Sequence, residues 1–333
     1  MELATIQRIV DVNTVENSDT LDVVTVLGWK VVVKRGEFKS GDLCLYVGLD
    51  SILPEIPEFE FLRPYHFRIK TIKLRGQISQ GLVFPISVVE NITTSLQKAF
   101  IGSLYMVGDD LTDALDIKKY EKEIDVHLRG MIAGNFPVYV SKTDEERIQN
   151  YMELLEEMRG VECYSSVKID GTSGTFCNYE GKNSLCSRRN AMQDDGENVY
   201  SYIYRKYALD MVFKKYPDIA IQGEIAGPKI QKNRLDLKTP ELFVFNVYDI
   251  HRHQYFDFFK FIDFCKATEL QHVEIDKIFP LVSSLEELLE MARGNYKSGY
   301  TREGIVIRPL KERYSNVLKN RFSFKVINND YKD

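Results

Sequence analysis

The sequence predicts an α+β protein with two domains, a small β-barrel followed by a larger domain of mixed strands and helices. Three observations support this prediction. The chain has 333 residues, a length typical of two domains. Its N-terminal third contains short apolar and β-branched runs separated by turn residues. From residue 163 onward, expected strands and helices alternate irregularly, as they do in the α+β class.

The first domain, placed at residues 1–115, is predicted to be built from short strands. Glycines and Ser40-Gly41-Asp42 supply the turns between them. Several short strands with close turns are typical of a β-barrel of the OB kind. The expected strands are residues 21–27, 30–34, 43–47, 67–73 and 81–85.

A connector is expected at residues 116–142, because a dense charge run at 118–125 offers little to bury. The second domain, residues 143–333, is expected to begin with a helix at 144–158, where apolar side chains recur at helical spacing. Further helices are expected at 200–216 and 285–292. Strands are expected at 164–169, 173–179, 220–225, 242–250 and 304–308.

Composition limits the function classes. The net charge of −5 gives no global basic field, so any nucleic-acid contact must come from a local patch. The five cysteines are scattered without a C-x-x-C pair, which disfavours a disulfide framework and a zinc site and favours a reducing compartment, cytoplasm or nucleus. No signal peptide or membrane span is expected.

Lys168-Ile169-Asp170-Gly171 is the first candidate for chemistry. A lysine becomes a nucleophile when partial desolvation or nearby positive charge, such as a metal ion, releases its proton. Alternation along an expected strand places Lys168 and Asp170 on one face, where Asp170 would hold a metal or its water shell. Taken alone, so short a motif favours a surface lysine followed by an ordinary Asp-Gly turn.

Five further segments follow in order, and with the lysine motif they carry a family resemblance. They are Ser187-Arg188-Arg189-Asn190, Gly223-Glu224-Ile225-Ala226-Gly227, Phe243-Val244-Phe245-Asn246-Val247-Tyr248-Asp249, Glu303-Gly304-Ile305-Val306-Ile307 and Ser323-Phe324-Lys325-Val326-Ile327. Over residues 140–330 the series resembles the covalent nucleotidyltransferases, namely DNA ligases, RNA ligases and mRNA-capping enzymes.

The domain order narrows the resemblance. DNA ligases and capping enzymes of this superfamily carry an OB domain after the closing lysine motif, whereas only eight residues follow Lys325 here. The OB-like module comes first instead. The chain therefore resembles the ATP-dependent RNA ligases with an N-terminal OB domain. This implies a nucleotidyltransferase (ATP-grasp-like ligase) domain built on antiparallel sheets with flanking helices.

The resemblance also implies the reaction. ATP would leave AMP covalently bound to Lys168, with Mg²⁺ or Mn²⁺ as cofactor. The AMP would pass to an RNA 5′-phosphate, and a 3′-hydroxyl would then displace it, sealing nicked or broken RNA. A monomer without membrane contact is expected.

The same resemblance implies residue roles. Asp170 and Glu303 would hold the metal through water, Glu224 would accept from the ribose hydroxyls, and Phe245 would stack on the adenine. Each has a simpler alternative, a solvated carboxylate for the acids and a core aromatic for Phe245. The full expected nucleotide-binding set is Ile169, Gly171, Arg188, Glu224, Phe245, Lys325, Arg147 and Gln149.

The closing motif departs from the family pattern. Many relatives have a second lysine where this chain has Ile327. Two alternatives remain open: Lys325 acts alone on phosphate, or Lys319 or Arg321 substitutes for the second lysine. For Arg147 and Gln149, a helix cap or a surface salt bridge is an equal alternative to a nucleotide contact.

The front module has its own basic candidates: Arg68, Lys70, Lys73 and Arg75. Alternation along an expected strand would place His66, Arg68 and Lys70 on one face. That face could follow an RNA backbone or bind the triphosphate of ATP. The alternative is an edge strand protected by charge.

Two competing functions remain open from the sequence. One is an RNA-binding protein with an inactive nucleotidyltransferase domain, although the lysine and the acidic residues are all present. The other is a capping-type guanylyltransferase or a DNA ligase, against which the domain order argues.

Overall fold

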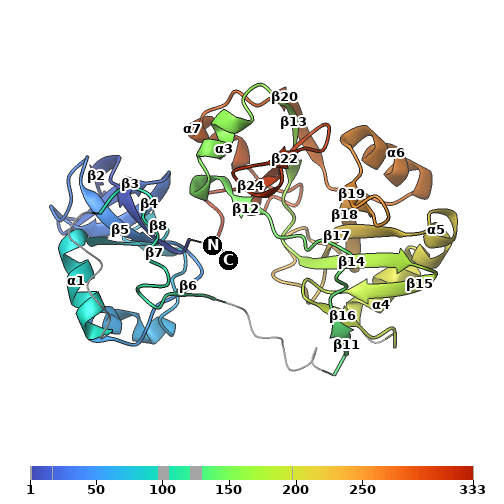
Figure 1. Cartoon of the computed structure of the whole chain (residues 1–333), viewed down its shortest axis with the longest axis horizontal. Coiled ribbons are helices and arrows are strands. Elements are labelled where there is room, and N and C mark those ends of the chain that lie inside the picture. Colours follow the sequence, from blue (N-terminus) through green and yellow to red (C-terminus); the bar gives the residue numbers. More distant parts are fainter. Residues whose placement is uncertain (1, 17, 97–104, 121–129, 197, 333) are drawn as a thin grey trace. The chain divides into compact units, whose positions relative to one another are not determined.

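The computed structural model describes residues 2–16, 18–96, 105–120, 130–196 and 198–332 (Figure 1). The chain divides into two compact units, residues 1–123 with 332–333, and residues 124–331. The expected connector contains a short strand near each end. Residues 118–119 form a strand in a sheet of the first unit, and residues 132–135 form one in a sheet of the second unit. The predicted domain limits at 115 and 143 stay predictions.

The first unit is built from small antiparallel sheets. One sheet has the order β1-β5-β9 and another is the meander β2-β3-β4. Trp29 is buried among the valines between these layers. The elements are β1 (Ala4–Arg8), β2 (Asp11–Thr14), β3 (Leu21–Val26), β4 (Trp29–Lys34), β5 (Leu43–Val47), β6 (Ser51–Ile52), η1 (Pro57–Tyr65), β7 (Ile72–Leu74), β8 (Gln77–Ser79), β9 (Leu82–Pro85), α1 (Ile86–Ser95) and β10 (Lys118–Lys119).

The predicted strand at 67–73 is wrong over most of its length. Only β7, Ile72–Leu74, is a strand, and it forms a hairpin with β8. His66 and Phe67 have positive φ angles of 52° and 56°, so the backbone there is left-handed and cannot continue a pleat. The expectation that His66, Arg68 and Lys70 share one strand face is therefore wrong as well.

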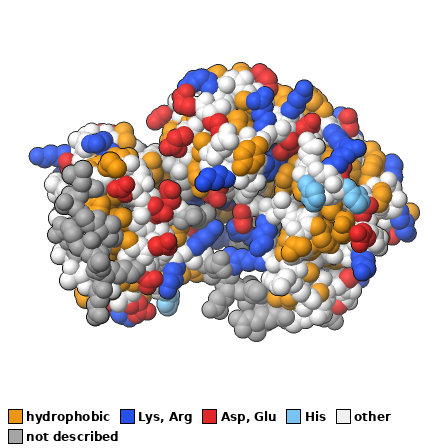
Figure 2. Space-filling model, viewed as in Figure 1, with side chains coloured by type: hydrophobic (Ala, Val, Ile, Leu, Met, Phe, Trp, Pro, Cys, Tyr) orange, Lys and Arg blue, Asp and Glu red, His pale blue; other side chains and the backbone are white. Residues whose placement is uncertain are grey.

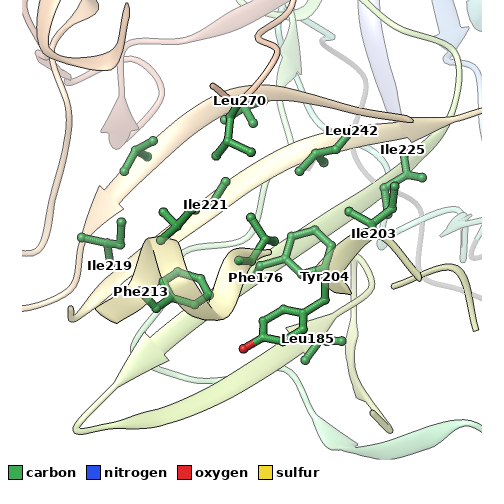
Figure 3. Close-up of a cluster of buried hydrophobic side chains, with 14 of the residues drawn as sticks. Phe176, Leu185, Ile203, Tyr204, Phe213, Ile219, Ile221, Ile225, Leu242 and Leu270 are labelled. Atoms are coloured by element: carbon green, nitrogen blue, oxygen red, sulfur yellow. The ribbon is translucent and has the colours of Figure 1, made fainter. Parts of the chain in front are cut away.

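The second unit contains two sheets. The larger has the order β11-β16-β15-β14-β17-β18-β19 and is antiparallel throughout. Its strands are β11 (Ile132–Asn135), β14 (Thr172–Tyr179), β15 (Lys182–Cys186), β16 (Asn190–Met192), β17 (Ile219–Ala226), β18 (Glu241–Asp249) and β19 (Gln254–Tyr255). Figure 3 shows one apolar face of this sheet, where Phe176 and Ile221 pack against Ile203 and Phe213 from the covering helices.

The smaller sheet has the order β12-β24-β21-β13-β20. Only the pair β12–β24 is parallel; the other neighbours are antiparallel. Helices α3 and α7 pack on this sheet around Phe322 and Phe324. The strands are β12 (Glu146–Arg147), β13 (Glu162–Val167), β20 (Ile275–Pro280), β21 (Gly304–Pro309) and β24 (Phe324–Ile327). A short hairpin, β22 (Tyr314–Ser315) with β23 (Asn320–Arg321), lies between β21 and β24 in the sequence.

The helices of the second unit differ from the prediction in three places, one of which is α6 (Phe258–Thr268), a helix that was not predicted. Only Glu153–Glu157 of the expected helix 144–158 is α-helical, because Arg147 is extended and pairs with β24. The helix expected at 200–216 is split at Ala208, whose φ is 45°. The elements are η2 (Ile148–Asn150), α3 (Glu153–Glu157), α4 (Val199–Lys206), α5 (Leu209–Lys215), α6 (Phe258–Thr268) and α7 (Leu285–Ala292).

The two sheets of the second unit meet over a small apolar cluster. It joins Val167 at the end of β13, and Ile169 just after it, to Ala226 and Phe243 from the larger sheet, with Tyr296 beside them. The lysine motif begins directly at this junction. None of the helices in the described ranges has the length and apolar character of a membrane span.

Candidate active site

Lys168 directly follows β13 instead of lying within it. Its backbone N–H donates to the carbonyl oxygen of Gly304, at 3.0 Å, so the residue still lies against the start of β21. Its Nζ is 2.7 Å from Oε1 of Glu303, and both side chains are largely covered. The structure thus brings the first and fifth sequence motifs into direct contact.

Three carboxylates surround this lysine. Burial alone would lower the pKa of Lys168, but attraction to Glu303, Glu224 and Asp170 outweighs it and raises the pKa. For Glu224, burial raises the pKa to about 8, with Lys168 opposing the rise and the other two acids adding to it. Without nucleotide, the site therefore holds Lys168 as an ammonium ion and carries an excess of acidic groups.

Asp170 has a partner that sequence reasoning did not find. Its Oδ2 lies 3.0 Å from Nε of Arg234, and both side chains are about nine-tenths buried. The guanidinium of Arg234 also lies 4.2 Å from the ring centre of Tyr331. Burial, followed by Glu303, raises the pKa of Asp170. Arg234 follows the glycine-flanked Glu motif in the sequence, and this position was the one signal that could have indicated it.

Gly171 is required because the lysine motif approaches β17 closely. A Cβ at this position would lie 2.4 Å from the carbonyl oxygen of Ile225 and 2.9 Å from Cγ of Glu224. Real Cβ atoms do not approach backbone oxygens so closely. The glycine therefore lets the lysine motif pack directly against β17. Ile169 is buried in the cluster between the sheets.

Lys325 lies in β24, where its parallel register partner is Arg147 in β12. Burial is the main cause that lowers the pKa of Lys325 to about 7, and the charges of Arg147 and Lys168 add to it. These cations lie close enough to repel one another. The carboxylate of Glu303 opposes this repulsion in part, and the pKa of Lys325 is lowered all the same.

Three other residues predicted to bind the nucleotide differ from Lys325 in their burial and contacts. Arg188 forms an ion pair with Asp144, and both side chains are exposed. Gln149 is fully buried, and its side-chain amide has no hydrogen-bond partner among the described residues. Phe245 is half-buried in β18, with the guanidinium of Arg308 at 5.6 Å from its ring centre.

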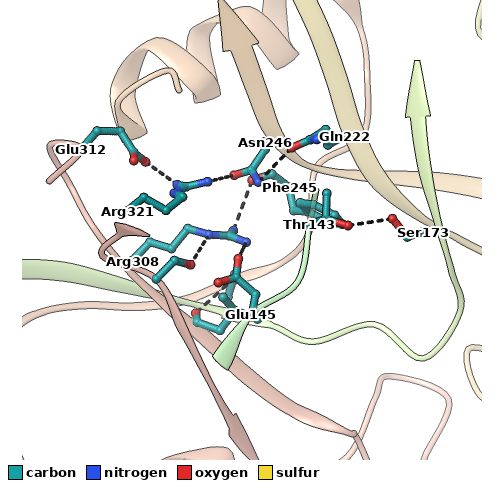
Figure 4. Close-up of polar contacts among 12 residues, drawn as sticks. Thr143, Glu145, Ser173, Gln222, Phe245, Asn246, Arg308, Glu312 and Arg321 are labelled. Atoms are coloured by element: carbon teal, nitrogen blue, oxygen red, sulfur yellow. Dashed lines mark hydrogen bonds and ion pairs between the residues drawn. The ribbon is translucent and has the colours of Figure 1, made fainter. Parts of the chain in front are cut away.

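A buried polar network contacts the backbone of Phe245 (Figure 4). Arg308 donates to the backbone oxygen of Phe245 at 3.2 Å, to Ser323 at 3.0 Å and to Glu145 at 2.7 Å. Arg321 donates to Asn246 at 3.0 Å and forms an ion pair with Glu312. The network joins both sheets to the segment that precedes β12. Several of its members lie in the sequence motifs, but Arg308 at its centre was not among the predicted site residues.

The basic candidates of the first unit fall into two groups. Arg68 is 2.7 Å from Asp50 and lies 3.4 Å from the ring centre of Tyr120, so its charge is already paired. Lys70, Lys73 and Arg75 are exposed. Figure 2 shows Lys and Arg side chains interspersed with Asp and Glu over the drawn face. Lys70 precedes β7, Lys73 lies in it, and Arg75 is in the turn that follows it.

A divalent cation fits the chemistry of the donors at Lys168. Carboxylate oxygens of Asp170 and Glu303 are the ligands that Mg²⁺ and Mn²⁺ accept, commonly one or two with substrate phosphates. The raised pKa values of Asp170 and Glu224 reflect acidic groups that a cation would stabilise. Within the described ranges, no three His, Cys, Asp or Glu residues are grouped tightly enough to hold a metal by themselves.

Comparisons with known proteins cover both units. A family model described as an OB-fold domain matches residues 3–86, and one described as RNA ligase matches residues 161–327. Comparison with curated protein sequences found no match.

Solved structures similar to the whole chain include the Naegleria gruberi RNA ligase with PPi. That structure has 31% identity and a TM-score of 0.82 over 99% of this chain and 98% of that one. A structure of a lysine-to-alanine mutant of the same ligase with ATP and Mn also matches over 99% of this chain and 98% of that one, with 31% identity and a TM-score of 0.83. A structure of a glutamate-to-alanine mutant with AMP and Mn matches over the same fractions of the two chains, again with 31% identity and a TM-score of 0.83.

Proposed function

The chain belongs to the RNA ligase family, and on that premise we propose that it joins RNA 3′-hydroxyl and 5′-phosphate ends through a lysyl-AMP on Lys168. It is an ATP-dependent RNA ligase with an N-terminal OB domain, and ATP and a divalent metal serve its reaction. The observation that carries the proposal is the 2.7 Å contact between Lys168 Nζ and Glu303, inside a group of three carboxylates.

In the proposed first step, Lys168 Nζ attacks the α-phosphorus of ATP. A phosphorus–nitrogen bond forms, the bond to the bridging oxygen breaks, pyrophosphate leaves, and the ammonium nitrogen gives up all but one of its protons. When bound, a divalent cation supplies positive charge that offsets the carboxylates and the triphosphate. Lys168 can then release the proton that its ion pair with Glu303 holds on the amine when no nucleotide is bound. Asp170 and Glu303 are the residues proposed to hold that cation through water.

The other proposed contacts orient the nucleotide. Glu224 accepts from the ribose hydroxyls, and Phe245 stacks on the adenine. Lys325 and Arg188 neutralise phosphate charge, and the charges of Arg147 and Lys168 beside Lys325 support this role. Arg147, Gln149, Ile169 and Gly171 complete the proposed nucleotide site, and the unpartnered amide of Gln149 supports its assignment.

In the proposed second step, the AMP phosphorus passes from Lys168 to an oxygen of the RNA 5′-phosphate, which restores the amine and creates a phosphoanhydride. In the third, the 3′-hydroxyl attacks the RNA 5′-phosphorus, a phosphodiester forms, and AMP leaves. All three steps are phosphoryl transfers, in which positioning and charge neutralisation provide most of the rate.

We further propose that Lys70, Lys73 and Arg75 contact RNA or the ATP triphosphate, because all three are exposed near one hairpin. The chain is proposed to act as a monomer. A reducing compartment, the cytoplasm or nucleus, is proposed because all five cysteines are free and buried.

The decisive experiment uses ATP labelled at the α-phosphate, a divalent metal and a denaturing gel. A protein band labelled by ATP, removed by added pyrophosphate and absent from Lys168→Ala is the expected result. The same variant should still seal a nick that carries a preformed RNA-adenylate, because Lys168 acts only before that stage. A labelled Lys168→Ala band would contradict the site, and labelling by GTP alone would contradict the ATP reaction.

A further inference from the structure

The hydroxyl group of Tyr296 links three residues of the candidate active site. It donates to the backbone carbonyl oxygen of Lys168, at 2.7 Å, and accepts from the backbone N–H groups of Asp170 and Glu303, each at 3.1 Å. Lys168 and Asp170 follow β13, while Glu303 precedes β21. One oxygen atom therefore joins the two chain segments whose side chains form the Lys168–Glu303 pair.

We propose that Tyr296 is a positioning residue for lysyl-AMP formation, fixing Lys168 Nζ and the carboxylates of Asp170 and Glu303 relative to one another. This inference rests on the proposed function of these residues. A tyrosine hydroxyl has one proton to donate and two lone pairs to accept with. All three are used here on backbone groups. No capacity remains for a substrate, so the hydroxyl acts through the residues it holds.

The surroundings keep this hydroxyl in place. Tyr296 is 8% exposed, and its ring packs in the cluster between the two sheets. Its own backbone N–H donates to the oxygen of Tyr300 at 2.8 Å, and its carbonyl accepts from Gly299 at 2.9 Å. Burial raises the pKa of Tyr296, which keeps the proton on the hydroxyl across the working range. The ring packing and these backbone hydrogen bonds thus hold the hydroxyl against the backbone of Lys168, Asp170 and Glu303.

A purely structural role for Tyr296 would come from its ring, which fills the cluster. The variant Tyr296→Phe keeps the ring and removes only the three hydrogen bonds. Tyr207→Phe is the matched control. Its hydroxyl also donates one hydrogen bond, to the carboxylate of Glu241 at 2.6 Å, and accepts from a backbone N–H, that of Leu242 at 3.3 Å, but it touches no proposed site residue.

The test is the single-turnover rate of lysyl-AMP formation over a range of ATP concentrations. Since ångström-scale misplacement of reacting groups costs up to about 100-fold, Tyr296→Phe should slow the maximal rate about 10- to 100-fold. The ATP concentration for half-maximal rate should change much less, and Tyr207→Phe should match wild type. A Tyr296→Phe rate equal to wild type would overturn the positioning role. Absence of lysyl-AMP in the wild type would instead overturn the proposed function.

A second measurement applies if Tyr296→Phe does not fold. A fluorinated tyrosine with a more acidic phenol, placed at position 296, keeps the shape and all three bonds while protonated. As pH rises and the phenol ionises, the bond to the carbonyl of Lys168 is lost, and the rate should fall. The same replacement at position 207 should leave the pH profile unchanged. Identical profiles for the two replacements would contradict the proposal.

Discussion

Replacing Arg308 with methionine should destabilise the second unit more than any exposed ion-pair change. The Arg308 side chain is 2% exposed and its partner Glu145 14% exposed, with 2.7 Å between them. Removing one partner of a buried pair leaves an uncompensated charge, which costs about 3–5 kcal/mol. At about 2–4 °C per kcal/mol for a unit of this size, the unfolding midpoint should fall by roughly 6–20 °C.

The loss should depend on pH in a defined direction. Burial alone would raise the pKa of Glu145, but Arg308 and Arg321 together lower it. Wild-type Glu145 therefore contributes stability above its unfolded pKa of about 4.3, and this contribution is lost as pH falls through the folded pKa. Without Arg308, the buried carboxylate costs stability at neutral pH, and protonation relieves the cost. The difference between the two proteins should thus shrink toward about pH 4.

The measurement must report on the second unit alone. The single tryptophan, Trp29, lies in the first unit, so its fluorescence is unsuitable. Amide hydrogen exchange of peptides from β21 and β24 gives the required local free energy. Arg159→Met is the control, because its pair with Glu156 is exposed. Arg308→Met combined with Glu145→Leu should recover most of the loss. A loss below about 1 kcal/mol, the range of surface pairs, would refute the reasoning.

Three further predictions concern the site and the first unit. Gly171→Ala should reduce lysyl-AMP formation at least about 100-fold by displacing the lysine motif, whereas Gly134→Ala, which has open space, should match wild type; normal labelling by the first variant would contradict the close packing. Because the pKa of Lys325 is lowered to about 7 from 10.5, the unfolded chain binds more protons between these values. Stability without nucleotide should therefore rise with pH over that window, and denaturant titrations of Lys325→Met should show a flatter rise. Lys73→Ala and Arg75→Ala should each lower the salt dependence of nicked-RNA binding by about one unit of slope without changing lysyl-AMP formation; reduced labelling would favour a triphosphate contact instead.

Local sequence patterns predicted much of the fold. The β-branched runs of β3 and β4 and the alternating stretches of β17 and β18 were predictable from side-chain periodicity. The comparisons confirm the α+β class and the order of an OB domain before a ligase domain. Errors arose where tertiary pairing overrides local preference. Residues 146–147 extend to pair with β24 although their neighbours have helical spacing. Helix α6, which is rich in aromatic residues, was missed altogether.

The sequence indicated which residues belong to the site, but not which of them form ion pairs or hydrogen bonds with one another. The motif series indicated Lys168, Glu224 and Glu303, which the structure brings together, while their catalytic roles stay predictions. The ion pair of Asp170 with Arg234 could not be found, because it depends on how a loop folds back. Tyr296 is one of 19 tyrosines, and nothing local distinguishes it. Only three-dimensional contact identifies such residues.

The strand order of the smaller sheet has a consequence for biosynthesis. β24 lies between β12 and β21, although among the described strands it comes last in the sequence. During translation, β12, β13 and β21 are made first and leave a gap where β24 belongs. Domains tend to fold from the N-terminus as they are synthesised, so the first unit can form early. The sheet behind Lys168 closes only once residues 324–327 have emerged. A nascent chain should therefore be unable to use ATP until synthesis has passed this strand.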